Sequence, residues 1–327
     1  MIVAVTFALS VLLCGLYLKL AQRWQIVDRP NERSSHERPT PHGGGIGLIV
    51  AFSLGLLLAA MQEGSWSSTY YLLAMGAQVL MVLGVVDDIT DLSRGLRFAI
   101  YGVLCFIVAI VLGPPAFATQ GVLAWFAIAC AAFAMLWLLN LYNFMDGIDG
   151  LAGLQAVVAA GGAGVLCLVL GGDARYALFC LLLAAAHLGF LYWNRPPARL
   201  FMGDAGSVPT GFLLAALALY GHIQGYLTGY AWLILLAVFI TDATWTLVWR
   251  MLKGQPFTRP HRLHAYQRLS RHWGSHGRVD ALFLGLAVCW LLPLAAMAAL
   301  WPEWGLFLVI LAYLPLLPGM AVAGRFA

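Results

Sequence analysis

The chain has 327 residues, of which 62% are hydrophobic and only 10% are charged, and its mean hydropathy is +0.86. Because an ordinary soluble domain carries about 25% charged residues, this composition excludes a soluble globular protein. The formal net charge of +4 suits an anionic membrane surface or anionic substrates, and it does not require nucleic acid as a partner.

Apolar runs long enough to cross a bilayer as helices recur along the whole chain. The runs are continuous rather than alternating in hydropathy, which favours helices over a membrane barrel. Eleven spans are predicted, at about residues 1–20, 46–62, 69–86, 98–113, 121–139, 152–171, 175–193, 207–221, 227–249, 280–300 and 304–322. The expected fold class is therefore an all-α integral membrane protein: one polytopic bundle of about 11 transmembrane helices, forming a single domain over residues 1–327.

Lysine and arginine are distributed very unequally between the two sides of these spans. Seventeen of the eighteen lie on the side that carries the loops at about 21–45, 87–97, 140–151, 194–206 and 250–279, and Arg175 alone lies on the other. Positive residues are retained on the cytoplasmic side of membrane proteins. The pattern therefore predicts that these five loops are cytoplasmic and that the N-terminus is outside.

The first of these loops ends in Gly43-Gly44-Gly45, immediately before a predicted span. Glycines allow the backbone to approach a ligand or a neighbouring helix closely, and N–H groups at the start of a helix can receive an anion. Two interpretations are open at this point: an anion-binding segment, or a connector that lets the next helix pack tightly.

Adjacent aspartates end the third predicted span. Asp87, Asp88 and Asp91 lie within five residues, and Arg94 and Arg97 follow on the next turns. Carboxylates crowded at a membrane boundary repel one another unless a cation or a basic partner lies among them. This arrangement favours a functional site over a solvated helix end.

A third cluster reads Asn143-Phe-Met-Asp146-Gly-Ile-Asp149-Gly. Its polar residues recur at every third position. Such hard oxygen donors suit Mg²⁺ or Mn²⁺, and no Cys/His set argues for zinc. Asp-Gly pairs are also common turn formers, so this segment alone is compatible with an ordinary turn between helices.

The fourth cluster runs from Asn194 through Phe-Met-Gly-Asp204-Ala-Gly-Ser207, where a predicted span begins. An aspartate between glycines at the start of a helix can present its carboxylate to a metal–phosphate complex. It can also simply cap the helix.

The last large loop, at about 250–279, is rich in arginine and contains four of the eight histidines. Both residue types form charge-assisted hydrogen bonds with phosphate oxygens. A positive-inside loop would explain the arginines but not the histidines. Together the loops supply acids for a divalent cation, basic groups for phosphate and access to lipid, as phosphoryl transfer at a membrane requires.

These motifs, in this order, resemble the polyprenyl-phosphate N-acetylhexosamine-1-phosphate transferases, glycosyltransferase family 4. The resemblance extends from Arg38-Pro-Thr-Pro-His-Gly-Gly-Gly to Arg278. It implies an enzyme, a glycosyl-1-phosphate transferase, that moves HexNAc-1-phosphate from a UDP-N-acetylhexosamine to undecaprenyl phosphate and releases UMP. It further implies a multi-pass protein of the bacterial inner (cytoplasmic) membrane that initiates lipid-linked glycans, such as the O-antigen of lipopolysaccharide, in cell wall biogenesis. A homodimer is compatible with this family.

The resemblance also assigns roles to residues at matching positions. Asp204 and Asn143 would bind Mg²⁺, with Mn²⁺ as an alternative ion, and Asp87 or Asp88 would deprotonate or orient the lipid phosphate. The remaining candidates would contact the nucleotide and the pyrophosphate: Asp146, Asp149, Arg97, Asn194, His261, Arg262 and His264. Direct attack of the lipid phosphate on the sugar-bearing phosphorus is expected, and a two-step path through an aspartyl-phosphate is the alternative.

The last loop departs from one branch of the family. It reads His261-Arg-Leu-His264-Ala-Tyr-Gln267, not the three consecutive histidines of the peptidoglycan translocase. This favours the O-antigen-initiating branch and disfavours a muramyl-pentapeptide substrate.

Two other functional classes explain less of the sequence. A CDP-alcohol phosphotransferase or a prenyltransferase would use aspartate clusters, but it leaves the Gly203-Asp204 segment and the histidines unexplained. A membrane transporter would place charges near the bilayer midplane. Only Asp242 and His187 lie clearly inside predicted spans, and both are expected to form hydrogen bonds between helices.

Overall fold

The computed structural model describes residues 1–29, 38–64, 66–90, 92–113, 121–255 and 261–326. Its elements are α1 (Ile2–Arg23), β1 (Val27–Asp28), β2 (Thr40–Pro41), α2 (Gly45–Glu63), α3 (Ser68–Thr90), α4 (Arg94–Leu112), α5 (Val122–Met145), α6 (Leu151–Val169), α7 (Ala174–Asn194), α8 (Asp204–Ile223), α9 (Gly229–Leu235), α10 (Ala237–Leu252), α11 (Ala265–Trp273), α12 (His276–Leu286), the π-helical η2 (Ala287–Leu291), α13 (Leu292–Leu300), the 3₁₀ turn η3 (Pro302–Trp304), α14 (Gly305–Tyr313) and α15 (Leu316–Ala323).

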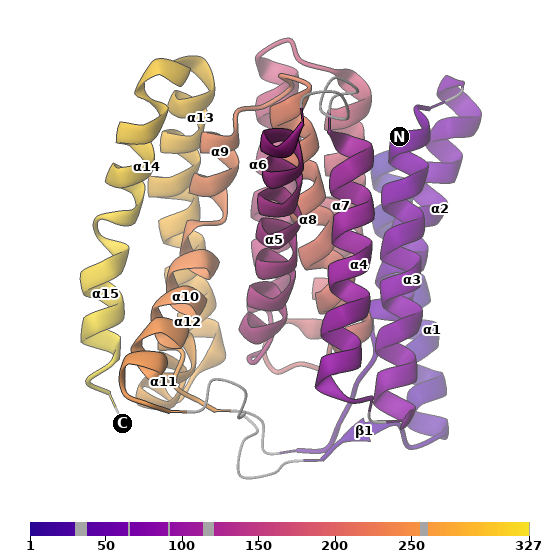
Figure 1. Cartoon of the computed structure of the whole chain (residues 1–327). Helices are drawn as coiled ribbons and strands as arrows, with labels where there is room; N and C mark the ends of the chain where they lie inside the picture. Colours follow the sequence, from indigo (N-terminus) through magenta and orange to yellow (C-terminus); the bar gives the residue numbers. More distant parts are fainter. Residues whose placement is uncertain (30–37, 65, 91, 114–120, 256–260, 327) are drawn as a thin grey trace.

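The predicted all-α membrane bundle is confirmed. The described residues contain ten helices long and apolar enough to cross a membrane, or eleven if α9 and α10, bent by 70° at their junction, form one broken span. The helices stand side by side, with the N-terminus at one end and β1, α11 and the C-terminus at the other (Figure 1). This placement of the termini agrees with an odd number of crossings. That the end with β1, α11 and the C-terminus faces the cytoplasm stays a prediction.

Several predicted boundaries differ from the observed ones. Helix α3 continues through Asp87 and Asp88 to Thr90, and α5 continues through Asn143 to Met145. The helices are thus longer than the apolar runs from which they were predicted, because polar residues extend them beyond the apolar segment. Asp91 and Arg259 lie outside the described residues.

The first loop contains the β structure of the described residues, a two-residue antiparallel ladder in which Val27 pairs with Pro41 and Asp28 with Thr40. Its glycine segment is bound to the segment before α8. Gly44 N donates to Phe201 O at 2.8 Å and Gly45 N to Met202 O at 3.0 Å. These two N–H groups are therefore used in packing rather than offered to an anion.

Helix α8 lies at the centre of the bundle. In the 18-residue apolar stretch of α8, 78% of the residues are buried, whereas only 22% are buried in the corresponding stretches of α1 and of the last span, Pro302–Ala323. Glycines allow its N-terminal turn to be approached closely: a Cβ on Gly45 would lie 2.2 Å from Gly206 Cα, and one on Gly84 would lie 2.5 Å from Ala205 N. No side chain fits at either contact. The close packing of α2 and α3 brings Asp204, the first residue of α8, next to the end of α3.

Candidate active site

An arginine joins two of the predicted acidic residues at the ends of α3 and α8. Arg97 Nη1 contacts Asp87 Oδ2, and it lies 3.4 Å from Asp204 Oδ2. Arg97 comes from the first turn of α4, which begins after the Ser93 cap. It supplies the positive charge that the crowded carboxylates require.

Asn143, near the end of α5, extends this network on the other side. Its Nδ2 donates to Asp204 Oδ1 at 2.8 Å and to Ser207 Oγ at 2.9 Å. The sequence left open whether Asn143 belonged to a turn or to a site. The structure brings it directly to Asp204, from a position 61 residues earlier in the chain.

The two adjacent aspartates have different surroundings. Asp87 accepts from Leu92 N at 2.9 Å as well as from Arg97, and its side chain is 9% exposed. Asp88 is 29% exposed, with His42 Nδ1 at 3.6 Å from its Oδ2. It is also close enough to Asp87, Asp204 and Arg97 to interact with their charges. Asp87 is thus held at both oxygens, whereas Asp88 is the more accessible carboxylate.

A cavity of about 550 Å³ opens beside this network. Its polar lining includes Arg97, Asn143, Asp204, His261 and His264. The structure therefore brings together the basic residues and the acids that the sequence placed in separate loops. The rest of the lining is largely apolar and comes mainly from α4 and α5: Phe98, Tyr101, Phe133, Leu136, Trp137 and Phe144.

The histidine segment is fixed by a buried acid that sequence reasoning did not assign to the site. Asp242 of α10 is 1% exposed and accepts from Ala265 N at 2.9 Å and from Tyr266 N at 3.0 Å. His264 Nδ1 lies 3.3 Å from Asp242 Oδ1. Asp242 therefore caps α11 from another helix and orients His264. His187, the other polar residue predicted inside a span, pairs with Thr210 of α8 at 3.0 Å.

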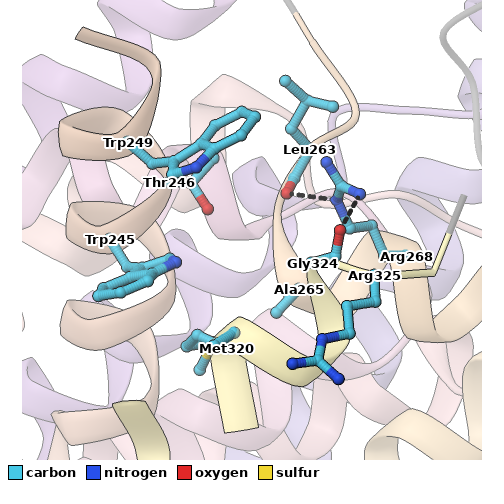
Figure 2. A pocket seen from close by; sticks show the side chains of 10 residues that line it. Trp245, Thr246, Trp249, Leu263, Ala265, Arg268, Met320, Gly324 and Arg325 are labelled. Atoms are coloured by element: carbon cyan, nitrogen blue, oxygen red, sulfur yellow. Dashed lines mark hydrogen bonds between the residues drawn. The ribbon is translucent and has the colours of Figure 1, made fainter. Parts of the chain in front are cut away.

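A second tie holds the same segment from the C-terminal side. Arg268 donates to Leu263 O at 3.1 Å through Nε and to Gly324 O at 2.9 Å through Nη1. Figure 2 shows both bonds beside a small pocket between α10 and the end of α15. The Arg268 guanidinium thereby connects Leu263, in the histidine segment, to Gly324 at the end of α15.

Asp149 and Asn194 lie in a neighbouring set of hydrogen bonds that braces two loops. Asp149 Oδ2 accepts from Ala198 N at 3.0 Å and lies 3.2 Å from His276 Nδ1. Asn194 accepts from Gly150 N at 3.0 Å and donates to Leu200 O at 3.0 Å. Both side chains are buried. The lining of the 550 Å³ cavity includes neither of them, nor Arg262.

Burial shifts the pKa of two candidate residues outside the spans. It raises the pKa of Asp146 to about 7, helped by the negative charges of Asp204 and Asp149. It lowers the pKa of His261 to about 4, helped by the neighbouring His264 and Arg250. At neutral pH His261 is therefore an uncharged hydrogen-bonding group rather than a cation.

The donor set at Asp204 fits a hard divalent cation in its chemistry. Carboxylate and amide oxygens are the ligands that Mg²⁺ prefers. Three carboxylates, those of Asp87, Asp88 and Asp204, gather around one arginine, which leaves net negative charge to neutralise. Within the described part of the chain, no group of three or more His, Cys, Asp or Glu residues is arranged to hold a metal. Here Arg97 occupies the position between two of the acids.

Comparison with known proteins gives the family. Residues 69–222 match the model of glycosyl transferase family 4. A probable undecaprenyl-phosphate N-acetylglucosaminyl 1-phosphate transferase of Bacillus subtilis is 28% identical over 297 residues, covering 87% of this chain and 81% of the relative. A decaprenyl-phosphate N-acetylglucosaminephosphotransferase of Mycobacterium tuberculosis is 30% identical over 294 residues, covering 80% of this chain and 72% of the relative.

The chain belongs to glycosyl transferase family 4. As the motifs predicted, it is a multi-pass membrane enzyme, a glycosyl-1-phosphate transferase. A phospho-N-acetylmuramoyl-pentapeptide-transferase of Listeria welshimeri is 26% identical over 312 residues, covering 87% of this chain and 93% of the relative. The two N-acetylglucosamine-1-phosphate transferases are thus more similar to this family 4 chain than that peptidoglycan enzyme is, as the last loop predicted.

Proposed function

We propose that this enzyme transfers HexNAc-1-phosphate from a UDP-N-acetylhexosamine to a polyprenyl phosphate, undecaprenyl phosphate, and releases UMP. The observation that carries the proposal is the network of Asp87, Arg97, Asp204 and Asn143 at the polar part of a largely apolar cavity. One substrate is a doubly charged pyrophosphate and the other is a lipid phosphate. A site that joins polar, charged groups to an apolar lining suits both.

Asp88 is the better candidate for the residue that receives or orients the lipid phosphate. Asp87 is engaged at both of its oxygens, whereas Asp88 is more exposed and faces only His42 at 3.6 Å among its described ion pairs. A phosphate monoester that carries a proton would lose it to this carboxylate. Asp87 would instead hold Arg97 in place.

The reaction would be a direct displacement. An oxygen of the lipid phosphate forms a bond to the phosphorus that bears the sugar, the bond from that phosphorus to the bridging oxygen breaks, and UMP leaves with that oxygen. Arg97, which already pairs with carboxylate oxygens, would neutralise charge on the transferred phosphate. The alternative, a phosphorylated aspartate, would be detected as a covalent phospho-enzyme formed without lipid acceptor.

Asp204 and Asn143 would hold Mg²⁺, or Mn²⁺, beside the pyrophosphate. Asn143 uses its Nδ2 for hydrogen bonds to Asp204 and Ser207, which leaves its amide oxygen as the metal-binding atom. The ion would neutralise the phosphate oxygens and improve UMP as a leaving group. Asp146 and Asp149 would act from the adjacent loop, toward the nucleotide.

The apolar lining supports a lipid substrate. Phe98, Tyr101, Phe133, Leu136 and Trp137 belong to α4 and α5, which are both predicted membrane spans. A prenyl chain entering from the bilayer would bury its methyl groups against these side chains, with the phosphate directed toward Arg97.

The test is UMP release by the purified protein. We expect release from UDP-N-acetylglucosamine only when undecaprenyl phosphate and Mg²⁺ are both present. Asp204→Asn should abolish it while the protein stays monodisperse. Equal activity without lipid acceptor, or in EDTA, would contradict the proposal.

We further propose that the product initiates O-antigen synthesis and that the site faces the cytoplasm. The His261-Arg-Leu-His264 segment supports the branch, and the arginine distribution supports the orientation. A panel of UDP-HexNAc donors would identify the sugar. Labelling of a cysteine introduced at Gly254 by a membrane-impermeant reagent would report the side, with reaction in intact cells contradicting the orientation.

A further inference from the structure

Gln267, the third residue of α11, lines the same cavity as Asn143, Asp204 and His264. The residue is 8% exposed. None of the roles proposed above uses it. Its environment nevertheless differs from that expected of a glutamine at this helical position.

Glutamine at the third position of a helix commonly reaches back to the N–H group at the start of that helix. That explanation fails here. Asp242 accepts from the N–H groups of Ala265 and Tyr266, the first two residues of the helix, and the side-chain oxygen of Gln267 does not bond the N–H group before them. Gln267 Oε1 is buried and has no hydrogen-bond partner in the described part of the chain.

The nitrogen of the same amide group lies near another polar group. The amide nitrogen of Gln267 lies near the Tyr266 hydroxyl, since a Cβ added at Gly147 would meet the hydroxyl oxygen at 2.2 Å and that nitrogen at 3.1 Å. The hydroxyl itself donates to Phe144 O at 2.9 Å. Because the hydroxyl proton goes to that carbonyl, the hydroxyl oxygen can only accept, which suits the amide nitrogen of Gln267 as its neighbour and not the amide oxygen. The orientation of the amide is thus fixed, with the oxygen as its uncommitted atom.

A buried acceptor without a donor is unfavourable, and in native proteins it calls for a specific cause. We propose that Gln267 Oε1 accepts a hydrogen bond from an N–H or O–H group on the hexosamine ring of the sugar nucleotide, and that Gln267 is thereby a specificity-determining residue. The proposal rests on the proposed function. The pyrophosphate oxygens carry no proton at neutral pH, and a prenyl chain has no N–H or O–H group.

The hexosamine is a better candidate than the uridine for the group that donates to Gln267 Oε1, because of where each is bonded in the sugar nucleotide. Asp204, Asn143 and His264, which line the same cavity as Gln267, are the residues assigned to the pyrophosphate and to the metal ion beside it. The hexosamine is bonded directly to that pyrophosphate, whereas uracil is separated from it by a ribose. A donor close to the phosphates therefore comes first from the sugar.

The test uses Gln267→Met, which keeps the length of the side chain and removes its hydrogen-bonding groups. The matched control is Tyr266→Phe, which removes the partner of the amide nitrogen but leaves Oε1 in place. We expect kcat/KM for UDP-N-acetylglucosamine to fall about tenfold in Gln267→Met and less than threefold in Tyr266→Phe. The inhibition constant of UMP should stay within twofold of wild type in both.

Three outcomes would overturn the proposal: equal losses in the two variants, which would make the role structural; a parallel weakening of UMP binding, which would make it a nucleotide contact; or no loss in Gln267→Met. If Gln267→Met is not monodisperse, Gln267→Asn, which withdraws the oxygen by one methylene, is measured in its place with the same expectation. Wild-type UMP release, measured first, tests the proposed function separately. If another UDP-HexNAc proves to be the donor, the same comparison is made with it.

Discussion

Replacing Arg97 by glutamine should release the acids that it holds together. Arg97 contacts both Asp87 and Asp204, at the ends of two different helices. A hydrogen bond to a charged group contributes about 1.5–3 kcal/mol, and partial exposure of Arg97 and Asp204 reduces this through solvent screening. We therefore expect Arg97→Gln to lower the free energy of unfolding by about 2 kcal/mol, because two carboxylates then repel each other without a counter-ion.

The measurement is the Tm of the detergent-solubilised protein in EDTA and in Mg²⁺. We expect a Tm lowered by several degrees in EDTA and partly restored by Mg²⁺, which would replace the missing charge. UMP release should fall by about a hundredfold. Asp87→Asn combined with Arg97→Gln should destabilise less than the sum of the single changes. A Tm unchanged in EDTA, with additive effects in the double variant, would refute this account of the network.

Three further predictions concern neighbouring residues. Asp146 has a pKa of about 7 in the folded protein against 3.8 ordinarily, so its ionisation opposes folding; the Tm without metal should fall as pH rises from about 4 to 7, and Asp146→Asn should flatten that pH dependence. Asn194→Ala should lower the free energy of unfolding by about 1–3 kcal/mol, since Gly150 N loses its acceptor; an unchanged Tm would contradict the bracing role. Asp242→Asn should lower UMP release through the positioning of His264, with the KM for UDP-sugar raised and the bundle still folded.

The bundle could be predicted from sequence because a helix that crosses the bilayer needs an apolar run of about 20 residues, and such runs are easily recognised. The break between α9 and α10 could not, because both halves are apolar and Leu236 carries no glycine or proline signal. The ends of α3 and α5 were predicted too early for a related reason. Hydropathy detects where a helix leaves the lipid, but not how far it continues beyond that point.

The network around Arg97 was only partly predictable. Asp87, Asn143 and Asp204 could be selected by residue type and position, but their convergence depends on close contacts between helices, as at Gly45 and Gly84. The capping of α11 by Asp242 joins residues 23 and 24 positions apart. No local pattern at either position reports it. Gln267 gave no signal either, because its significance lies in an unused acceptor and not in its residue type.

The arginines show most clearly what the structure adds to composition. Arg195 and Arg199, just beyond the end of α7, lie over aromatic rings: Arg199 is 4.6 Å from the ring of Trp193 and Arg195 is 5.6 Å from that of Tyr192. Such pairs anchor a helix at the membrane interface. Arg97 counts equally in the positive-inside pattern but pairs with two carboxylates beside the cavity. One charge distribution therefore contains two kinds of arginine, those placed over aromatic rings and one paired with carboxylates, and only the partners of each guanidinium distinguish them.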